Sequence, residues 1–233
     1  MTLLRSVKRL LVSETVKPRR ILAGPFKGIR MNLSLRNQMQ IYCGLFEREL
    51  HPSIRHLSRG IATAIDIGAA YGEYTIFFLT KTPARKIFAF EPGLQYLSIL
   101  KDHLEMNQAD LSRVALSTKL VGASDSEQAI SLDSLAQVVQ TPCLVKMDVD
   151  GAEEQILQGA TLFNLRPDIR WIIETHSKEL EVRCVEMLKA AHFETKIIPN
   201  AWWRTFLPEM RPTEHNRWLV AWKTAGEPGR SWA

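Results

Sequence analysis

The middle of this chain alternates short apolar runs with longer amphipathic stretches, and this alternation restricts the fold more than any other feature. The apolar runs are nearly continuous, as in strands buried on both faces of a sheet. They lie at 61–68, 86–91, 114–122, 143–149, 171–175 and 193–198. The stretches between them with helical spacing are 73–81, 93–107, 152–164 and 178–192. The pattern predicts an α/β fold with an open, mainly parallel sheet and helices on both faces.

The end of this region departs from the alternation. A last apolar run at 217–223 follows the run at 193–198 without a helical stretch between them. Parallel neighbours need a crossover, usually a helix, whereas antiparallel neighbours do not. We therefore expect an antiparallel last strand that closes one end of the sheet.

The first sixty residues differ from the rest of the chain in charge. They carry 12 Lys and Arg against 3 Asp and Glu, whereas the whole chain carries 30 against 25. We divide the chain into a basic N-terminal extension at 1–60, with an amphipathic helix and a turn-rich segment, a folded domain at 61–225 and a frayed tail at 226–233. Such an extension suits anionic lipid, nucleic acid or a phosphorylated substrate, or is simply a solvated basic surface.

The N-terminus and the cysteines bear on the compartment. No run reaches the roughly 18 apolar residues of a membrane span, and no signal-peptide cleavage site follows the first leucines. The 3 cysteines are widely spaced and form no CxxC pair, which favours a cytoplasmic protein. An apolar stripe on residues 1–12 either contacts a membrane surface or, as we prefer, packs on the domain or a second subunit.

The sharpest local signal lies at 66–79, where a strand ends in Asp66, a glycine-rich turn follows and a helix begins. Such a turn brings backbone amides close to a ligand at the carboxyl edge of the sheet. The dinucleotide fingerprint G-x-G-x-x-G would need glycine where Ala70 and Glu73 stand, so a pyrophosphate is not expected. The next strand ends in Glu91, whose carboxylate can accept both ribose hydroxyls. The pattern predicts a nucleoside site without phosphates; the alternative is a capping turn with two structural carboxylates.

A second polar group follows the fourth and fifth strands and comprises Asp148, Asp150, Glu174 and His176. Parallel strand ends open on one edge, so these side chains should converge beside the glycine turn. His176 is the natural general base because its ordinary pKa lies near neutrality, and Asp148 would orient the acceptor or the cofactor. The alternatives are a divalent metal held by Asp, Glu and His, and a purely structural carboxylate–histidine hydrogen bond.

Two further features lie near these strand ends. Lys146 stands two residues before Asp148, so it should point to the same face, where it would neutralise carboxylates, meet an anionic acceptor or form a structural ion pair. Trp202, Trp203 and Arg204 precede the last strand, where aromatic planes could stack on a sugar. We prefer ordinary hairpin packing for these three residues.

Six motifs together carry a family resemblance. They are DIGAAYGEYT, FAFEP, LEMN, SLDSL, VKMDVDGAEEQILQGA and IIETH, in this order. Their combination resembles the FkbM family of S-adenosylmethionine-dependent methyltransferases over roughly residues 61–198, and FKGIRMNL with CGLFEREL resembles the segment before the domain in many members. Asp150 departs from the family pattern, which usually has Glu there.

The resemblance implies a class I, Rossmann-like methyltransferase fold and S-adenosylmethionine (SAM) as cofactor. Gly68, Tyr71 and Gly72 would line the methionine part of SAM. Glu91 would hold its ribose, and Asp66 would sit under its amino group. An acidic turn suits this donor, because the sulfonium group is a cation.

The implied reaction is O-methylation of a hydroxyl on a small molecule or saccharide, whereas the residues alone support only methyl transfer. Asp125, after the third strand, would meet the adenine amino group. His176, Asp148 and Glu174 are the expected catalytic residues, and a divalent metal is not favoured. The alternatives are a nucleic-acid methyltransferase or binding protein that uses the basic extension, and a non-catalytic, membrane-associated scaffold.

Overall fold

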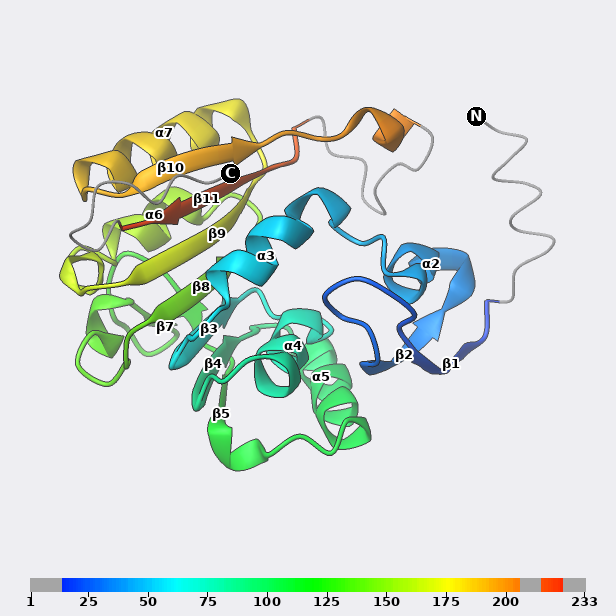
Figure 1. Cartoon of the computed structure of the whole chain (residues 1–233). Helices are drawn as coiled ribbons and strands as arrows, with labels where there is room; N and C mark the ends of the chain where they lie inside the picture. Colours follow the sequence, from blue (N-terminus) through cyan, green and yellow to red (C-terminus); the bar gives the residue numbers. More distant parts are fainter. Residues whose placement is uncertain (1–13, 206–214, 224–233) are drawn as a thin grey trace.

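The centre of the computed structural model is a seven-stranded sheet with helices on both faces and an N-terminal hairpin beside it (Figure 1). The structure describes residues 14–205 and 215–223. The expected helix at 1–12 and the expected tail at 226–233 therefore lie outside the described residues. Within the described ranges, no helix is long and apolar enough to cross a membrane.

The strand order is β10-β11-β9-β8-β3-β4-β5. The strands are β3 (Thr63–Ile67), β4 (Lys86–Phe90), β5 (Val114–Ser117), β8 (Cys143–Met147), β9 (Ile169–Thr175), β10 (Glu194–Ile198) and β11 (Arg217–Trp222). Neighbours from β5 through β9 pair in parallel, whereas β11 lies between β9 and β10 and is antiparallel to both. The predicted α/β fold, with a mainly parallel sheet and an antiparallel last strand, is confirmed.

The helices cover two separate hydrophobic cores, one on each face of the sheet. α3 (His51–Leu57), α4 (Glu73–Lys81) and α5 (Leu94–Met106) contribute to one core, and α6 (Glu153–Gln158) and α7 (Lys178–Ala190) to the other. Successive strand residues serve opposite cores, as Leu144 and Val145 of β8 do. Burial on both faces explains why the strand sequences are nearly continuous apolar runs.

Two expected elements are shorter in the structure. The expected strand at 114–122 is divided, because β6 (Leu120–Val121) leaves the main sheet and pairs with β7 (Ala129–Ile130). The expected helix at 152–164 ends at Gln158, directly before Gly159, and a 3₁₀ turn at Phe163–Leu165 follows. A Cβ atom on Gly159 would lie 2.1 Å from the carbonyl oxygen of Gly122. The backbones of Gly159 and Gly122 therefore approach too closely for a residue with a side chain at position 159.

The segment before the sheet packs into the first core. It contains the hairpin of β1 (Val16–Arg20) and β2 (Arg30–Ser34), followed by α2 (Leu35–Cys43), a 3₁₀ turn (Arg48–Leu50) and α3. Met31 and Leu33 of β2 are buried in the core that α4 and α5 share. The turn-rich part of the expected extension is thus joined to the α/β domain by a common core.

Candidate active site

The carboxyl ends of β3, β4, β8 and β9 meet at one edge of the sheet and gather carboxylates there. We call this group the acidic edge, and its members are Glu47, Asp66, Glu73, Glu91, Asp148, Asp150, Glu153 and Glu174. Lys146 and His176 lie among them. The structure therefore brings together the two groups that the sequence places at the strand ends.

The turn between β3 and α4 lies directly against the end of β8. Gly68 has φ of 79°, and a Cβ atom there would lie 1.9 Å from the carbonyl oxygen of Asp148. Gly72, with φ of 90°, immediately precedes α4, and a Cβ atom there would lie 2.9 Å from Leu100. Both positions need glycine, because they combine a left-handed backbone with a close approach.

Most backbone N–H groups of this turn are used within the protein. The N–H groups of Gly68 and Ala69 donate to the carbonyl oxygen of Phe90 at 2.9 and 3.0 Å, and that of Gly72 donates to Ala69 at 2.8 Å. The N–H group of Ala70 donates to Glu91 at 2.8 Å. Few donors are left to cradle a phosphate, in agreement with the missing glycines of the dinucleotide fingerprint.

Glu91 joins the turn to the end of β4. It is 7% exposed; its Oε2 accepts from Ala70 and its Oε1 accepts from the N–H group of Gly93 at 2.8 Å. A carboxylate offers about four lone-pair sites, so both oxygens can still accept from a ligand. Two fixed N–H donors orient this carboxylate toward the turn, as a ribose-binding group requires.

Asp66 lies under the turn and is buried. Its Oδ2 accepts from the hydroxyl of Thr75 at 2.5 Å. Burial raises the pKa of Asp66 to about 6, although the Thr75 hydrogen bond and Lys146 oppose the shift. Tyr71, also in the turn, packs edge-on against Tyr96 with ring centroids 5.3 Å apart.

Asp125 lies between β6 and β7, where its carboxylate accepts hydrogen bonds from nearby residues of the chain. Its Oδ1 accepts from the N–H group of Ser131 at 2.6 Å, and its Oδ2 accepts from the hydroxyl of Ser134. The Ser134 and Ser131 hydrogen bonds lower the pKa of Asp125. These bonds give it a turn-stabilising role, and its expected contact with adenine stays a prediction.

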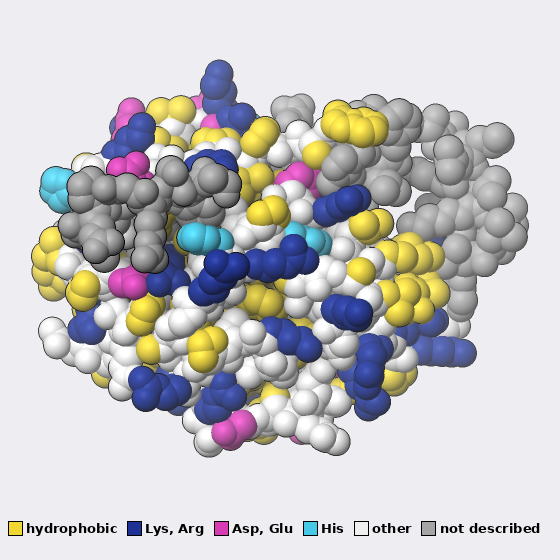
Figure 2. All heavy atoms as spheres, in the orientation of Figure 1, with side chains coloured by type: hydrophobic (Ala, Val, Ile, Leu, Met, Phe, Trp, Pro, Cys, Tyr) yellow, Lys and Arg dark blue, Asp and Glu magenta, His cyan; other side chains and the backbone are white. Residues whose placement is uncertain are grey.

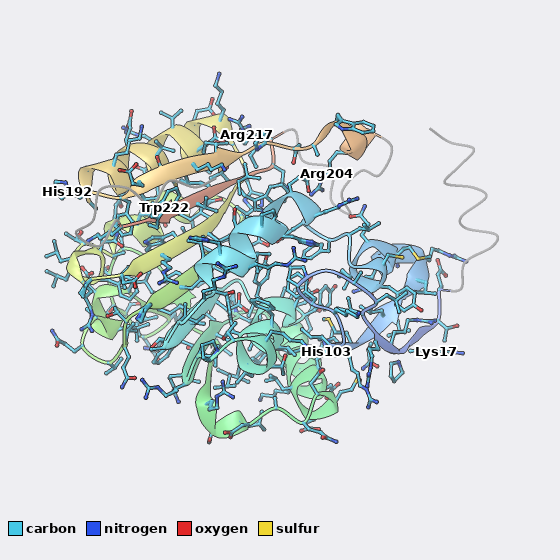
Figure 3. All side chains as sticks on the ribbon, viewed as in Figure 1. Lys17, His103, His192, Arg204, Arg217 and Trp222 are labelled. Atoms are coloured by element: carbon cyan, nitrogen blue, oxygen red, sulfur yellow. The ribbon has the colours of Figure 1, made fainter. Side chains whose placement is uncertain are left out.

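His103 of α5, labelled in Figure 3, forms hydrogen bonds with the glycine turn and with the N-terminal hairpin. Its Nδ1–H donates to the carbonyl oxygen of Tyr71 at 2.8 Å, and its Nε2 accepts from the N–H group of Asn32 in β2 at 2.9 Å. The Asn32 donor places the ring hydrogen on Nδ1. The N-terminal hairpin is thereby linked to the glycine turn through one buried imidazole, which the sequence did not single out.

Lys146 is the buried cation of the acidic edge, with an exposure of 1%. Its Nζ lies 3.6 Å from Asp148, 3.8 Å from Glu174 and 4.9 Å from the ring centre of Tyr74. Burial alone would lower the pKa of Lys146, but the surrounding carboxylates raise it above its usual value. The prediction that Lys146 shares a strand face with Asp148 is confirmed, and its burial favours the ion-pair interpretation.

Glu47 reaches the acidic edge from the segment before α3. It has φ of 46°, an unusual conformation for a residue other than glycine, and it accepts a hydrogen bond from the hydroxyl of Tyr74. Burial raises the pKa of Glu47, while Lys146 opposes the shift. Glu47 lies within the family-like segment CGLFEREL, but no role was predicted for it, because its position depends on how the N-terminal segment packs against α4.

His176 is held by Glu153, a fully buried residue in the first turn of α6. The Nδ1 atom of His176 lies 2.9 Å from Oε1 of Glu153. Its Nε2 faces Asp148 and Asp150, each at 3.7 Å, and Glu174 at 3.9 Å. The Glu153 hydrogen bond raises the pKa of His176, although burial opposes the shift.

This arrangement is a carboxylate–imidazole pair with one imidazole nitrogen directed at the edge. The structure brings together all four residues that the sequence placed here. Glu153 was missed as an individual residue. The available signal was the acidic pair Glu153 and Glu154, two and three residues after Gly151, at the start of a helix that continues with Ile156 and Leu157. A buried carboxylate that fixes a histidine tautomer is the arrangement that general bases commonly use.

Asp148, Glu174 and His176 also offer ligand atoms within 4.8 Å of one another, as a divalent cation would require. However, the ammonium group of Lys146 lies 3.6 and 3.8 Å from the same two carboxylates. Burial and the neighbouring Asp148 carboxylate raise the pKa of Glu174 well above its usual value, which favours its neutral form. A cation beside Lys146 would be repelled, so these donors fit a divalent metal poorly.

The connection before β11 is tied to the N-terminal segment. Arg204 donates to both carboxylate oxygens of Glu49, at 2.7 and 3.0 Å, and lies 5.1 Å above the ring centre of Trp218 (Figure 3). Trp202 is 79% exposed, and its expected packing in the hairpin stays a prediction. The side chain of Trp203 lies outside the described part of the chain.

Comparisons with known proteins bear on the fold. A scan against family models finds no match, and neither does a search of curated proteins. A solved FkbM methyltransferase from Methylobacillus flagellatus KT is 16% identical with a TM-score of 0.54, and the match covers 69% of this chain and 43% of that one. This chain thus spans less than half of that protein.

Two further solved structures match most of their own length. The precorrin-6y C5,15-methyltransferase of Geobacter metallireducens GS-15 is 19% identical, with a TM-score of 0.52 and coverage of 78% of this chain and 90% of that one. A putative methyltransferase of Streptococcus mutans in complex with SAH is 17% identical, with a TM-score of 0.51 and coverage of 76% and 98%. The fold is that of the class I, Rossmann-like methyltransferases.

Proposed function

We propose that this protein is a SAM-dependent methyltransferase, related to the FkbM family, that methylates a hydroxyl group of a small molecule or saccharide. The observation that carries the proposal is Glu91, which directly follows β4 and accepts a hydrogen bond from the N–H group of Ala70 in the glycine turn. In a methyltransferase fold, a carboxylate at this position, beside a turn that offers little to phosphates, supports a ribose-binding role for Glu91. The structurally similar methyltransferases, one of them in complex with SAH, support the same reading.

The residues proposed to hold the cofactor are those beside the turn. Glu91 would accept the ribose hydroxyls, Gly68, Tyr71 and Gly72 would line the methionine part, and Asp66 would lie under the amino group. Asp125 is retained as the proposed partner of adenine. When bound, SAM supplies an electrophilic methyl group on a sulfonium cation. The acidic edge suits that cation, because the nearest buried carboxylates lower its electrostatic energy.

His176 is the proposed general base. Its Nε2 would accept the proton that an acceptor hydroxyl loses, while Glu153 holds Nδ1–H and stabilises the imidazolium that forms. Asp148 and Glu174, which face Nε2, would orient the acceptor hydroxyl. The remaining contribution is alignment of acceptor and donor at near-attack distance.

The charge of the acidic edge restricts the acceptor. Glu47, Asp148 and Glu174 face the buried Lys146, and Arg204 also acts on Glu47. A phosphate or carboxylate brought to His176 would meet the carboxylates of Asp148 and Asp150, each 3.7 Å from Nε2, whereas a neutral hydroxyl would not be repelled by them. This favours a saccharide or other polyol over nucleic acid as the methylated molecule. In the proposed division of the chain, residues 61–225 form the methyltransferase domain, and residues 1–60 extend it.

A methyl-transfer assay tests the proposal. The purified protein is incubated with SAM labelled in the methyl group and with three acceptor sets: neutral sugars, their phosphate esters, and structured RNA. We expect label in one or more neutral sugars and a weaker signal in the corresponding phosphate esters. Label confined to RNA would contradict the proposed acceptor, and binding of SAM without transfer to any set would favour the scaffold.

A further inference from the structure

A second charged region lies away from the acidic edge, where α3 and α4 end. A shallow hollow of about 440 Å³ opens there. Its lining residues are Gly24, Pro25, Arg55, Ser58, Arg59, Phe77, Lys81 and Pro83. Three of these are cations and none is acidic, within the part of the chain that the structure describes. We call Arg55, Arg59, Lys81 and the adjoining Lys27 the basic face.

The acidic residues of the same segment do not neutralise this face. Glu14 pairs with Arg36, Glu47 accepts from Tyr74, and Glu49 binds Arg204. These are all the carboxylates between residues 14 and 60. Among the described residues, no carboxylate forms an ion pair with Arg55, Arg59, Lys81 or Lys27, so these exposed cations present their charge to solvent.

Burial lowers the pKa of His56 in α3, and Arg59 of the basic face and Arg170 lower it further. The side chain of Lys81 also stands beside the hairpin, because a Cβ atom on Gly28 would lie 3.6 Å from its Nζ. Figure 2 shows Lys and Arg side chains gathered across the middle of this view, over α3 and toward the hairpin, with few Asp or Glu side chains among them.

An exposed apolar side chain belongs to the same hairpin loop as the hollow residues Gly24 and Pro25. Leu22 precedes the hollow residue Gly24 by two positions and is 54% exposed. The one aromatic ring of the hollow, Phe77, is only 4% exposed. The hairpin loop therefore offers an exposed apolar side chain to a lipid surface, and the described lining of the hollow has no exposed ring on which a nucleic-acid base could stack.

We propose that the basic face docks on the surface of an anionic lipid bilayer, with headgroup phosphates in the hollow between Arg55, Arg59 and Lys81. Lys and Arg near an anionic surface each gain about 1 kcal/mol, or roughly fivefold in binding. The basic face lies at the carboxyl end of α4, whereas the glycine turn lies at its amino end, so a docked protein would keep its acidic edge accessible. Nine helical residues place these ends about 13 Å apart.

Vesicle sedimentation with the full chain tests the proposal. The vesicles are phosphatidylcholine with or without phosphatidylglycerol, and a fluorescent RNA duplex is a parallel probe. The test variant combines Arg55→Gln, Arg59→Gln and Lys81→Gln. The control variant combines Lys119→Gln, Arg183→Gln and Lys189→Gln, which removes the same charge from exposed positions elsewhere. Circular dichroism melts establish that both variants are folded.

We expect binding that requires phosphatidylglycerol, a loss of about a hundredfold in the test variant, and a much smaller loss in the control variant. The added variant Leu22→Ser should weaken binding while leaving its dependence on phosphatidylglycerol intact. Vesicle binding that the test variant retains, an equal loss in both variants, or binding to the RNA duplex but not to vesicles would overturn the proposal.

Discussion

The acidic edge and the basic face lie at opposite ends of α4 and carry opposite charge. At the amino end, Glu47, Asp148 and Glu174 surround the buried Lys146. At the carboxyl end, Arg55, Arg59 and Lys81 line an open hollow without a carboxylate among the described residues. The formal net charge of +5 hides this division. The net charge therefore indicates little about what binds at the acidic edge or at the basic face. The local arrangement of charged residues indicates more.

The two regions also differ in how the protein holds their charges. The cations of the basic face are exposed, so salt screens them and their loss should cost little stability. The charges of the acidic edge are largely buried, and each depends on its neighbours. Substitutions at the acidic edge should therefore change catalysis and stability, whereas substitutions on the basic face should change docking alone.

The largest expected effect is the fall in kcat when the proposed general base, His176, is replaced. His176→Asn keeps a side-chain donor for Glu153 but has no basic nitrogen, so kcat should fall by about 10² to 10⁴. The affinity for S-adenosylhomocysteine should stay within about twofold, because the proposed cofactor residues are unchanged. The matched control is His192→Asn, at an exposed position with φ of 63° that asparagine tolerates. Near-normal turnover of His176→Asn would remove the general base from the account.

The buried cation should have the largest effect on stability. Lys146→Met leaves carboxylates without their counter-ion, so the free energy of unfolding should fall by about 3 to 5 kcal/mol at neutral pH. Urea unfolding measures this change, and Lys101→Met, at an exposed position, is the control.

The loss of stability caused by Lys146→Met should become smaller as the pH falls. Burial raises the folded-state pKa of Glu47 and of Asp66, the latter to about 6, so their charged forms cost stability above the unfolded-state values. As the pH falls from 7 toward 4, these groups take up protons and the cost disappears. The difference between Lys146→Met and the wild type should therefore shrink over this range; a difference that grows would contradict the account.

Removing the hydrogen bond between Glu153 and His176 should have a smaller effect, on the pH dependence of kcat/KM. A general base acts when deprotonated, so kcat/KM should rise with pH through the pKa of His176, which the Glu153 hydrogen bond raises. Glu153→Gln should move the midpoint to lower pH, because the largest cause of the raised pKa is removed. Asp148, Asp150 and Glu174 also face the imidazole, so part of the upward shift should remain. An unchanged midpoint would assign Glu153 a purely structural role.

The smallest expected effect is that of removing metal. Lys146 already neutralises the carboxylates that a divalent cation would need, so EDTA and added Mg²⁺ should each leave turnover within about twofold. The measurement is initial rate before and after dialysis against EDTA. A loss of activity that Mg²⁺ or Mn²⁺ restores would replace the ion-pair description of the acidic edge with a metal site.

The sequence predicts the fold well where burial on both faces of the sheet leaves a continuous apolar run. β8 and β9 are such cases, and α4 has the expected bounds Glu73–Lys81. The positions of Asp66, Glu91, Asp148 and Glu174 were also predictable, because parallel strands open on one edge. The pairing of β6 with β7 was not, since a two-residue pair outside the main sheet leaves no periodic signal.

The residues that the sequence did not mark depend on contacts between distant segments. Glu47 reaches Tyr74 across 27 positions, and Glu153 reaches His176 across 23. His103 joins Asn32 and Tyr71, which belong to different parts of the chain. A single glutamate or histidine has no periodicity, so only the packed structure shows which of them is buried and what it holds.

The most direct test of the central claim is a calorimetric titration with S-adenosylhomocysteine. The wild type is compared with Glu91→Ala and with Glu127→Ala, an exposed control, and NAD is titrated in parallel. We predict micromolar binding to the wild type and the control, a loss of about a hundredfold or more in Glu91→Ala because the ribose partner is gone, and no binding of NAD. A folded wild-type protein that does not bind S-adenosylhomocysteine would contradict the account.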